Sequence, residues 1–278
     1  MRDPFPETTE FGRLIRGVEP IDLVGVSLEI ARDAYPGLDA GAILGQIDAL
    51  ARRVRERCGD RARPEQVIGQ INWVLFIEEE FRGNVEDYQD PKNSYINEVL
   101  ARKLGIPISL SVLYATLAGR VGLRLSGVNL PLHFLLRIDE PGPARFVDPF
   151  HRGAILDHRG CESLLARISG RAVTLHPEHL APCAATTIVA RMLRNLKGIY
   201  LQQADPASTL PVIRRLAALQ RDDPGEQRDW GMACLQADRP GESIGPLQRY
   251  LQAMPEADDV EAVRILLRGA LREVALRN

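Results

Sequence analysis

The amino-terminal part of the chain carries apolar side chains at the spacing of amphipathic helices. Apolar residues recur every three or four positions over 21–34, 43–54 and 67–76. Pro36-Gly37 separates the first run from the second, and Pro64 stands where a third helix would begin. The pattern therefore predicts three helices ahead of the central segment.

The helical pattern continues to about residue 121 and then gives way to a period of two. Ser94 is the expected N-cap of a short helix, and a strongly apolar helix follows from about Ser109 to Val121. Apolar and polar residues then alternate over 125–129, 134–138 and 145–147, which is typical of short strands. The central segment is therefore expected to combine helices with a small antiparallel sheet.

A turn joins the second and third of these predicted strands. Residues 141–143 read Pro-Gly-Pro, which favours a tight reversal of the chain. A hairpin centred on this turn would place position 133 roughly opposite 150 or 151. His133 and Asp148 are therefore expected close together at one end of the sheet.

Two stretches near the carboxyl end resemble each other. Asp205–Gln220 is followed by Pro224 and Arg239–Met254 by Pro255, so the copies are offset by about 34 residues, the period of helix-pair repeats. Only about two repeats fit, fewer than a free-standing solenoid needs, so the module should depend on the preceding domain for burial. Stacked helix pairs commonly bind a partner.

Composition excludes several classes of function. Lys and Arg total 35 against 37 Asp and Glu, a net charge of −2, so no overall field attracts nucleic acid or an anionic membrane. No apolar run reaches the roughly 20 residues of a membrane span, and no glycine-rich nucleotide motif occurs. The four cysteines form no C-x-x-C pair, and the amino terminus does not resemble a signal peptide. We therefore expect a cytoplasmic protein with neither a nucleic-acid nor a membrane partner.

Serine, histidine and aspartate follow one another in an order that suits a catalytic triad. Ser109 and Ser111 open the apolar helix, His133 interrupts an apolar run, and Asp148 follows the next predicted strand. A hydroxyl, a base and an orienting carboxylate are the parts needed for acyl transfer. Simpler interpretations stay open, because a serine at a helix start is often a cap and a buried His–Asp pair can be a structural clip.

Five segments form a recognisable set of motifs: NSYINEVL (Asn93–Leu100), GIPISLS (Gly105–Ser111), NLPLHFLLR (Asn129–Arg137), VDPF (Val147–Phe150) and RMLRNLKGIYL (Arg191–Leu201). Together they resemble the SirB-type invasion-regulator group, a bacterial family that joins a transglutaminase-like core to tetratricopeptide-type repeats. The resemblance covers most of the chain. It implies an α+β, papain- or transglutaminase-like domain with a helical preface over residues 1–182. An all-α tetratricopeptide-like module would then occupy 183–278.

The resemblance also implies a set of site residues. Transglutaminase-type enzymes place a cysteine before a Tyr-Ala pair, and Ser111 has that spacing to Tyr114 and Ala115. Ser109 is a close second because the helix is about one turn shorter than the enzyme pattern. The implied residues are Ser111 and Ser109 at the nucleophile position, His133 and Asp148 as its partners, and Asn93, Asn97 and Tyr114 as binding residues.

In this interpretation oxygen stands where the related enzymes have sulfur. Histidine and a helix amino terminus ionise a thiol near neutral pH, whereas a serine hydroxyl is not ionised in that way. Replacing sulfur by oxygen on such a scaffold usually removes most of the rate. We therefore expect a non-catalytic, pseudo-transglutaminase protein that binds or regulates a protein or peptide partner through its repeats. The alternative is a Ser-His-Asp amidase, acyl transferase or hydrolase acting on a peptide or protein.

Two further groups of side chains have competing interpretations. His176, His179, Cys161 and Cys183 invite a zinc site, but their spacing matches no closed structural site, so neither a metal nor a cofactor is expected. Three basic residues share one face of a later helix, which is either solvated or binds an acidic partner. They are Arg191, Arg194 and Lys197.

Overall fold

The computed structural model describes residues 4–59 and 62–277. The chain forms two compact units that divide between Met192 and Leu193. This division falls within helix α8 (Ala185–Gln202), whereas the expected boundary after residue 182 lies in the loop before that helix.

The helices predicted for the amino-terminal part are present. Aspartate side chains begin two of them, because Asp22 accepts a hydrogen bond from the amide of Val24 and Asp39 from that of Ala42. The three predicted helices are α2 (Leu23–Ala34), α3 (Ala40–Cys58) and α4 (Pro64–Asn72), and a short helix that the pattern did not predict, α1 (Glu10–Leu14), precedes them. The apolar faces of α2, α3 and α4 form one core with the helices that follow.

The third predicted helix changes form at Asn72. The chain continues as a π-helical turn, η1 (Trp73–Glu78), rather than as regular helix to Phe76. The Phe76 carbonyl in this turn accepts a hydrogen bond from the Arg152 guanidinium at 2.7 Å. Apolar spacing does not distinguish the two helix types, because both bury the same side chains over so short a segment.

The apolar central helix, α6 (Pro107–Arg120), is buried along most of its length. It begins two residues before the predicted start, with Pro107 in the first turn. It follows η2 (Pro91–Ser94) and α5 (Ile96–Arg102). The expectation that Ser94 caps α5 is wrong, because Tyr95 holds the N-cap position and Ser94 belongs to the preceding turn.

The sheet contains the three predicted strands and one more. Its order is β3-β4-β5-β6, all antiparallel. The strands are β3 (Leu125–Val128), β4 (Leu135–Ile138), β5 (Phe146–Asp148) and β6 (Ala154–Leu156). A separate parallel pair joins β1 (Arg82–Gly83) to β2 (Leu104–Gly105). The additional strands are too short to show a period of two.

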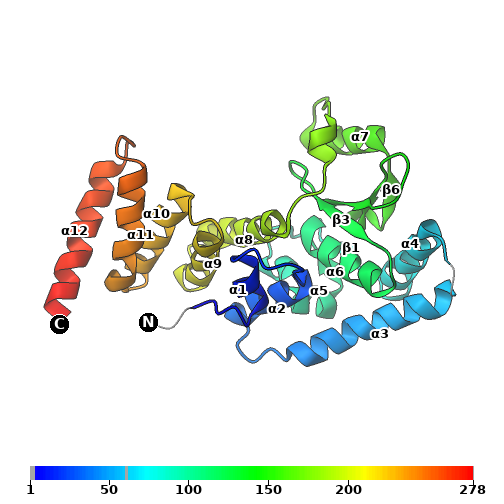
Figure 1. Ribbon diagram of the computed structural model, residues 1–278, viewed down its shortest axis with the longest axis horizontal. Helices are drawn as coiled ribbons and strands as arrows, with labels where there is room; N and C mark the ends of the chain where they lie inside the picture. The colour runs from blue at the N-terminus through cyan, green and yellow to red at the C-terminus, as the bar shows by residue number, and fades with distance from the viewer. Residues whose placement is uncertain (1–3, 60–61, 278) are drawn as a thin grey trace. The chain divides into compact units, whose positions relative to one another are not determined.

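Helices cover both faces of the sheet. Leu136 and Val147 point into the core that contains α6, whereas Leu135 and Phe146 join a second cluster with Leu164 of α7 (His158–Ser169). Alternate residues of β4 and β5 thus face opposite layers, as strand geometry requires. Figure 1 shows α6 and α7 on either side of the strands. Two 3-10 turns, η3 (Pro149–His151) and η4 (Pro177–Leu180), lie in the connections.

The carboxyl-terminal unit is entirely helical over its described residues. Helices α9 and α11 begin at Pro206 and Pro240, in agreement with the offset of about 34 that the sequence predicts. The helices after α8 are α9 (Pro206–Leu219), α10 (Pro224–Gln236), α11 (Pro240–Ala253) and α12 (Val260–Arg277). Each packs on its neighbour in sequence, the arrangement of a repeat array.

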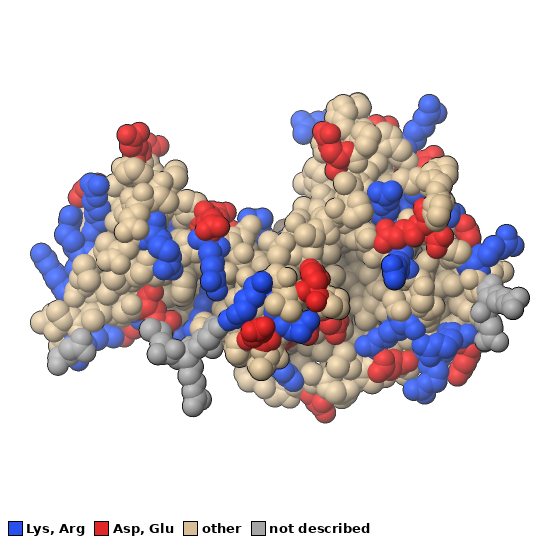
Figure 2. Space-filling model, in the orientation of Figure 1, with Lys and Arg blue, Asp and Glu red and all other residues tan. Residues whose placement is uncertain are grey.

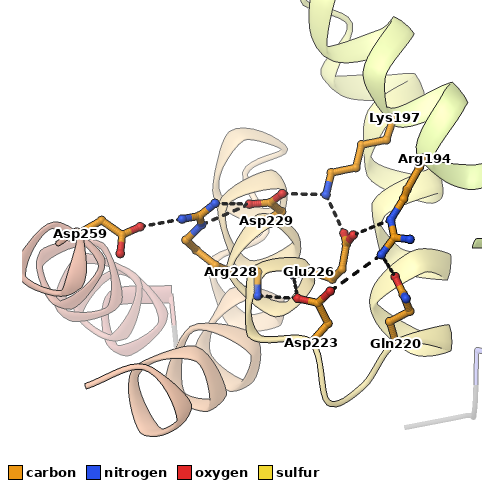
Figure 3. A network of polar contacts seen from close by, with 9 residues as sticks. Arg194, Lys197, Gln220, Asp223, Glu226, Arg228, Asp229 and Asp259 are labelled. Atoms are coloured by element: carbon orange, nitrogen blue, oxygen red, sulfur yellow. Dashed lines mark hydrogen bonds and ion pairs between the residues drawn. The ribbon is translucent and has the colours of Figure 1, made fainter. Parts of the chain in front are cut away.

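Acidic groups of the carboxyl-terminal unit bind two of the three basic residues on α8. Lys197 Nζ lies 2.6 Å from Glu226 Oε2 and 2.7 Å from Asp229 Oδ2, and the Lys197 side chain is only 13% exposed. Arg194 contacts Gln220 at 2.6 Å and Glu226 at 3.6 Å (Figure 3). Acidic groups of the same unit therefore occupy the ammonium group of Lys197. This residue neither lies on a solvated face nor remains free to bind an acidic partner protein.

Helix composition and surface charge bear on the expectation of neither a membrane nor a nucleic-acid partner. None of the described helices combines the length and the apolar composition needed to cross a bilayer. Figure 2 shows basic and acidic side chains interspersed on the visible face of the larger unit. This mixture agrees with the nearly balanced charge of the sequence.

Candidate functional site

Pairing of β4 with β5 brings His133 to Asp148. Leu136 lies opposite Val147, a register that places position 133 opposite 150 and confirms the hairpin expected from the Pro-Gly-Pro turn. His133 Nε2 lies 2.9 Å from Asp148 Oδ2. The two side chains are 2% and 1% exposed, so this contact is shielded from water.

The two carboxylate oxygens of Asp148 have different partners. Oδ1 accepts backbone hydrogen bonds from Phe150 at 3.1 Å and His151 at 3.3 Å, and so begins the η3 turn. Oδ2 faces His133 Nε2 and also lies 2.7 Å from His151 Nδ1. One carboxylate therefore organises the turn and orients two imidazoles.

These contacts keep Asp148 ionised. Burial raises the pKa of the carboxyl, but hydrogen bonds from His133 and His151 and the charges of both rings lower it by more, to about 2. At neutral pH the centre therefore contains a buried negative charge between two imidazoles.

A second network holds the η3 turn against the helices. Asn72 Nδ2 donates to the Gly153 carbonyl at 3.0 Å, and the Tyr114 hydroxyl donates to Asn72 Oδ1 at 2.8 Å. Tyr114 is fully buried, and burial raises the pKa of its hydroxyl. Tyr114 therefore supports, through Asn72, the loop that follows the turn carrying Asp148 and His151.

The hydroxyl of Ser109 is occupied at the start of α6. It donates to the Asn93 carbonyl at 2.6 Å and accepts a hydrogen bond from the Ile106 amide at 3.1 Å. Ser109 is 2% exposed. The geometry is that of a buried helix-start contact, which was the simpler interpretation of this serine.

Ser111 has a different environment. Its side chain is fully buried, and its hydroxyl has no hydrogen-bond partner among the described residues. The described hydrogen bonds of the His133 ring go to Asp148, and neither serine hydroxyl is among its partners. The structure thus brings His133 and Asp148 together without a hydrogen bond from either serine to the imidazole.

The two asparagines lie in the segment that precedes α6. Asn93 Nδ2 donates to the Asp87 carbonyl at 2.7 Å, and its Oδ1 accepts from Asn84 at 3.0 Å. Asn97 places its Oδ1 in the interior without a hydrogen-bond partner in the described chain. Asn93 therefore supports the 84–93 loop through its whole amide.

The Phe150 ring lies between those of His133 and Tyr88 in a chain of edge-to-face contacts. The Phe150 ring centroid lies 6.0 Å from that of His133 and 6.3 Å from that of Tyr88, both edge to face. A side chain at Gly83 would meet the Phe150 ring at 2.4 Å, so β1 and η3 pack closely. Nearby, Arg191 donates to Asn129 Oδ1 at 2.6 Å.

Three residues of this centre were not expected from the sequence: His151, Asn72 and Gly153. The spacing of Asp148 and His151 was a usable signal, because an aspartate that caps a short turn places the third following side chain beside its carboxylate. Asn72 had no such signal, because it meets the turn only through tertiary packing.

His133, Asp148 and His151 also form the metal-compatible group found among the described residues. One ligand atom from each lies within 4.8 Å of the others. The alternative group of His176, His179, Cys161 and Cys183 does not gather in this way. His179 Nδ1 instead accepts the backbone amide of His176 at 2.9 Å.

Comparison with known proteins matches both units. The transglutaminase-like superfamily model matches residues 41–194, and a tetratricopeptide-repeat model matches residues 196–268. These matches confirm the expected fold class, a transglutaminase-like domain followed by a helical repeat region.

Relatives with similar sequences occur in several bacteria. A UPF0162 protein of Xylella fastidiosa is 33% identical over 252 residues, which cover 88% of this chain and 89% of the relative. A UPF0162 protein of Vibrio cholerae is 30% identical over 68% of this chain and 71% of its own length. F-box only protein 21 of Mus musculus is 39% identical over 110 residues, but these are 37% of this chain and 18% of that protein. No solved structure gives a significant match.

Proposed function

The chain belongs to the transglutaminase-like superfamily and carries tetratricopeptide repeats, and from this premise we propose that it is a non-catalytic binding or regulatory protein. Repeats of this type generally mediate protein–protein interactions, so the combination of modules points to an interaction or regulatory role. In the proposal, the His133–Asp148 pair maintains a transglutaminase-like framework, and the repeats contact a cytoplasmic protein or peptide.

The burial of both serine hydroxyls carries this proposal. A nucleophile needs a path to the substrate and a base in hydrogen-bond contact. The Ser109 hydroxyl already donates to a backbone carbonyl, and Ser111 is fully buried. Neither hydroxyl therefore has the surroundings of an activated nucleophile.

The thiols do not replace the missing nucleophile. Burial raises the pKa of each cysteine, to about 12 at Cys161 and about 11 at Cys234. The pKa values of Cys58 and Cys183 are raised as well. Reactive cysteines have the opposite shift, because only the thiolate attacks efficiently.

One observation favours the alternative Ser-His-Asp amidase, acyl transferase or hydrolase. The Ser111 hydroxyl has no partner among the described residues. Asp148 holds His133 by Nε2, which leaves Nδ1 as the ring nitrogen that could accept a proton. A rearrangement that moved Ser111 to that nitrogen would complete a triad.

Labelling with a fluorophosphonate probe tests the proposal. The purified full chain should remain unlabelled in a sample where an added serine hydrolase is labelled to completion. Labelling of the chain that disappears both in Ser111→Ala or Ser109→Ala and in His133→Ala would establish the enzyme and refute the proposal. Labelling that persists in the Ser109→Ala/Ser111→Ala double variant would come from another residue and would be consistent with a non-catalytic centre.

Binding is tested separately with the unmodified chain. Peptide pools are added, and the midpoint of thermal unfolding is measured. A specific ligand that binds the folded state raises this midpoint in a concentration-dependent way. Saturable stabilisation by a peptide that is recovered unchanged supports the binding role, whereas recovery of a cleaved or acylated peptide contradicts it.

A further inference from the structure

Three potential metal ligands converge on the buried end of β5. His133 Nε2 and His151 Nδ1 both face Asp148 Oδ2, at 2.9 and 2.7 Å, and the three atoms lie within 4.8 Å of one another. Two imidazole nitrogens and one carboxylate oxygen suit zinc and neighbouring divalent transition metals. Sequence reasoning expected no metal, because it considered different histidines.

The three ligands are held by different parts of the fold. Asp148 Oδ1 is fixed by the backbone amides of Phe150 and His151, so Oδ2 has a defined direction. His133 is positioned by the register of the hairpin. Backbone hydrogen bonds to a ligating carboxylate are the kind of outer contact that orients ligands at metal sites.

The three ligands differ in exposure. His133 and Asp148 are almost completely buried, whereas the His151 side chain is 42% exposed. We therefore expect an ion to enter from the His151 side and to keep water or another ligand at the remaining coordination position. Three protein ligands with one open position describe many zinc sites.

The distances require a small adjustment. Bonds of about 2.0–2.1 Å in a tetrahedral zinc site place neighbouring ligand atoms roughly 3.3 Å apart. The two observed nitrogen–oxygen distances are a few tenths of an ångström shorter, as expected when hydrogen bonds hold the same atoms. We expect a rotation of the His151 ring to provide this adjustment, because His151 is the exposed member of the group.

We propose that His133, Asp148 and His151 bind one divalent transition-metal ion of the zinc class. In the metal-free chain, a proton on each facing nitrogen donates to Asp148 Oδ2. On binding, each facing nitrogen gives up that proton and the other nitrogen of its ring carries one instead, so the ion replaces two hydrogen bonds. Calcium and magnesium fit less well, because they require more oxygen ligands.

This inference goes beyond the proposed binding role and does not depend on it. A bound ion would lock the η3 turn to the start of β4 whether or not a partner binds the repeats. The metal experiment and the probe-labelling experiment can therefore fail independently.

Calorimetry with the untagged, chelator-treated full chain tests the site. Zinc chloride should bind with one ion per chain, and cobalt chloride should give a visible absorption band as it binds. His151→Ala should weaken zinc binding at least about tenfold, because losing a ligand costs no less than losing an outer contact. His176→Ala/His179→Ala is the matched control and should stay within about twofold of the unmodified chain.

Loss of a metal ligand can be distinguished from loss of the fold, because His151 is partly exposed and its replacement should leave the fold intact. The thermal midpoint of metal-free His151→Ala verifies this, and His151→Gln provides a second variant. Absence of binding would overturn the proposal. Equal affinity in the His151 variants, or an equal loss in the His176/His179 control, would assign the ion elsewhere and overturn it too.

Discussion

Asn72 binds the backbone of Gly153 through an amide hydrogen bond of 3.0 Å, across a sequence separation of 81 residues. The contact joins the end of α4 to the loop that follows η3. Tyr114 completes it by donating to the other end of the same amide. The position of the His133–Asp148–His151 group therefore depends on Asn72, Gly153 and Tyr114, none of which belongs to the group.

Gly153→Ala should destabilise the protein strongly. Gly153 has a φ of +73°, and an added Cβ would lie 1.9 Å from Asn72 Oδ1. The backbone strain alone costs about 1–2 kcal/mol, and displacing Asn72 adds to it, so we expect a loss of roughly 3 kcal/mol in denaturant unfolding. Gly170→Ala is the control, because Gly170 has a φ of +71° with nothing within 4 Å. An equal loss in both variants would show that the Asn72 contact contributes nothing.

Tyr114→Phe should lower stability by about 1–2 kcal/mol, because it removes the hydroxyl that satisfies Asn72 Oδ1 in the interior. Tyr88→Phe is the matched control. Tyr88 is 43% exposed and should change the free energy of unfolding by less than about 0.5 kcal/mol. Chemical denaturation of both variants measures the difference. An unchanged stability in Tyr114→Phe would refute the structural contribution of this hydroxyl.

The two serines should respond to alanine in opposite directions. Ser109→Ala removes a hydroxyl with backbone partners on both sides and should cost about 1–2 kcal/mol. Ser111→Ala removes a buried hydroxyl that has no described partner, so it should be neutral or stabilising by up to about 1 kcal/mol. Urea unfolding of the two variants checks the sign. A large loss in Ser111→Ala would reveal a partner for that hydroxyl.

Lys197→Met should destabilise the repeat unit by roughly 2–3 kcal/mol, because it leaves the buried carboxylate of Glu226 without its closest partner. Arg194→Met is the control. Arg194 is 49% exposed and lies farther from the same carboxylate, so its removal should cost less than about 1 kcal/mol. Thermal unfolding followed by circular dichroism measures both. Equal losses of stability in the two variants would contradict the expectation that the buried ion pair of Lys197 contributes more than the exposed contact of Arg194.

The same contact predicts a dependence on alkaline pH. Burial lowers the pKa of Lys197, but hydrogen bonds to Asp229 and Glu226 outweigh it and raise the pKa above its ordinary value of 10.5. A raised pKa in the folded state means that the stabilisation is complete below pH 10.5 and is lost as the pH rises through the folded-state pKa. The stability difference between the unmodified chain and Lys197→Met should therefore shrink above that pH. A constant difference would refute the assignment.

Local patterns in the sequence determined much of the fold. Helical spacing located α2, α3 and α6, and alternation located β3 to β5. The turn at 141–143 was sufficient to predict the hairpin register, because strand pairing follows directly from the position of a tight turn. The repeats were visible for a similar reason, since each copy carries its own apolar stripe.

The sequence by itself thus determined α2, α3, α6, the strands β3 to β5 and the meeting of His133 with Asp148. Only the tertiary structure decided the state of each side chain: the Ser109 hydroxyl is occupied by Asn93, Ser111 is buried without a described partner, and His151 turns toward the carboxylate. The physical reason is that periodicity and turns act between neighbours in the chain. Hydrogen-bond satisfaction and burial instead depend on which distant segments pack together, as Asn72 and Gly153 do.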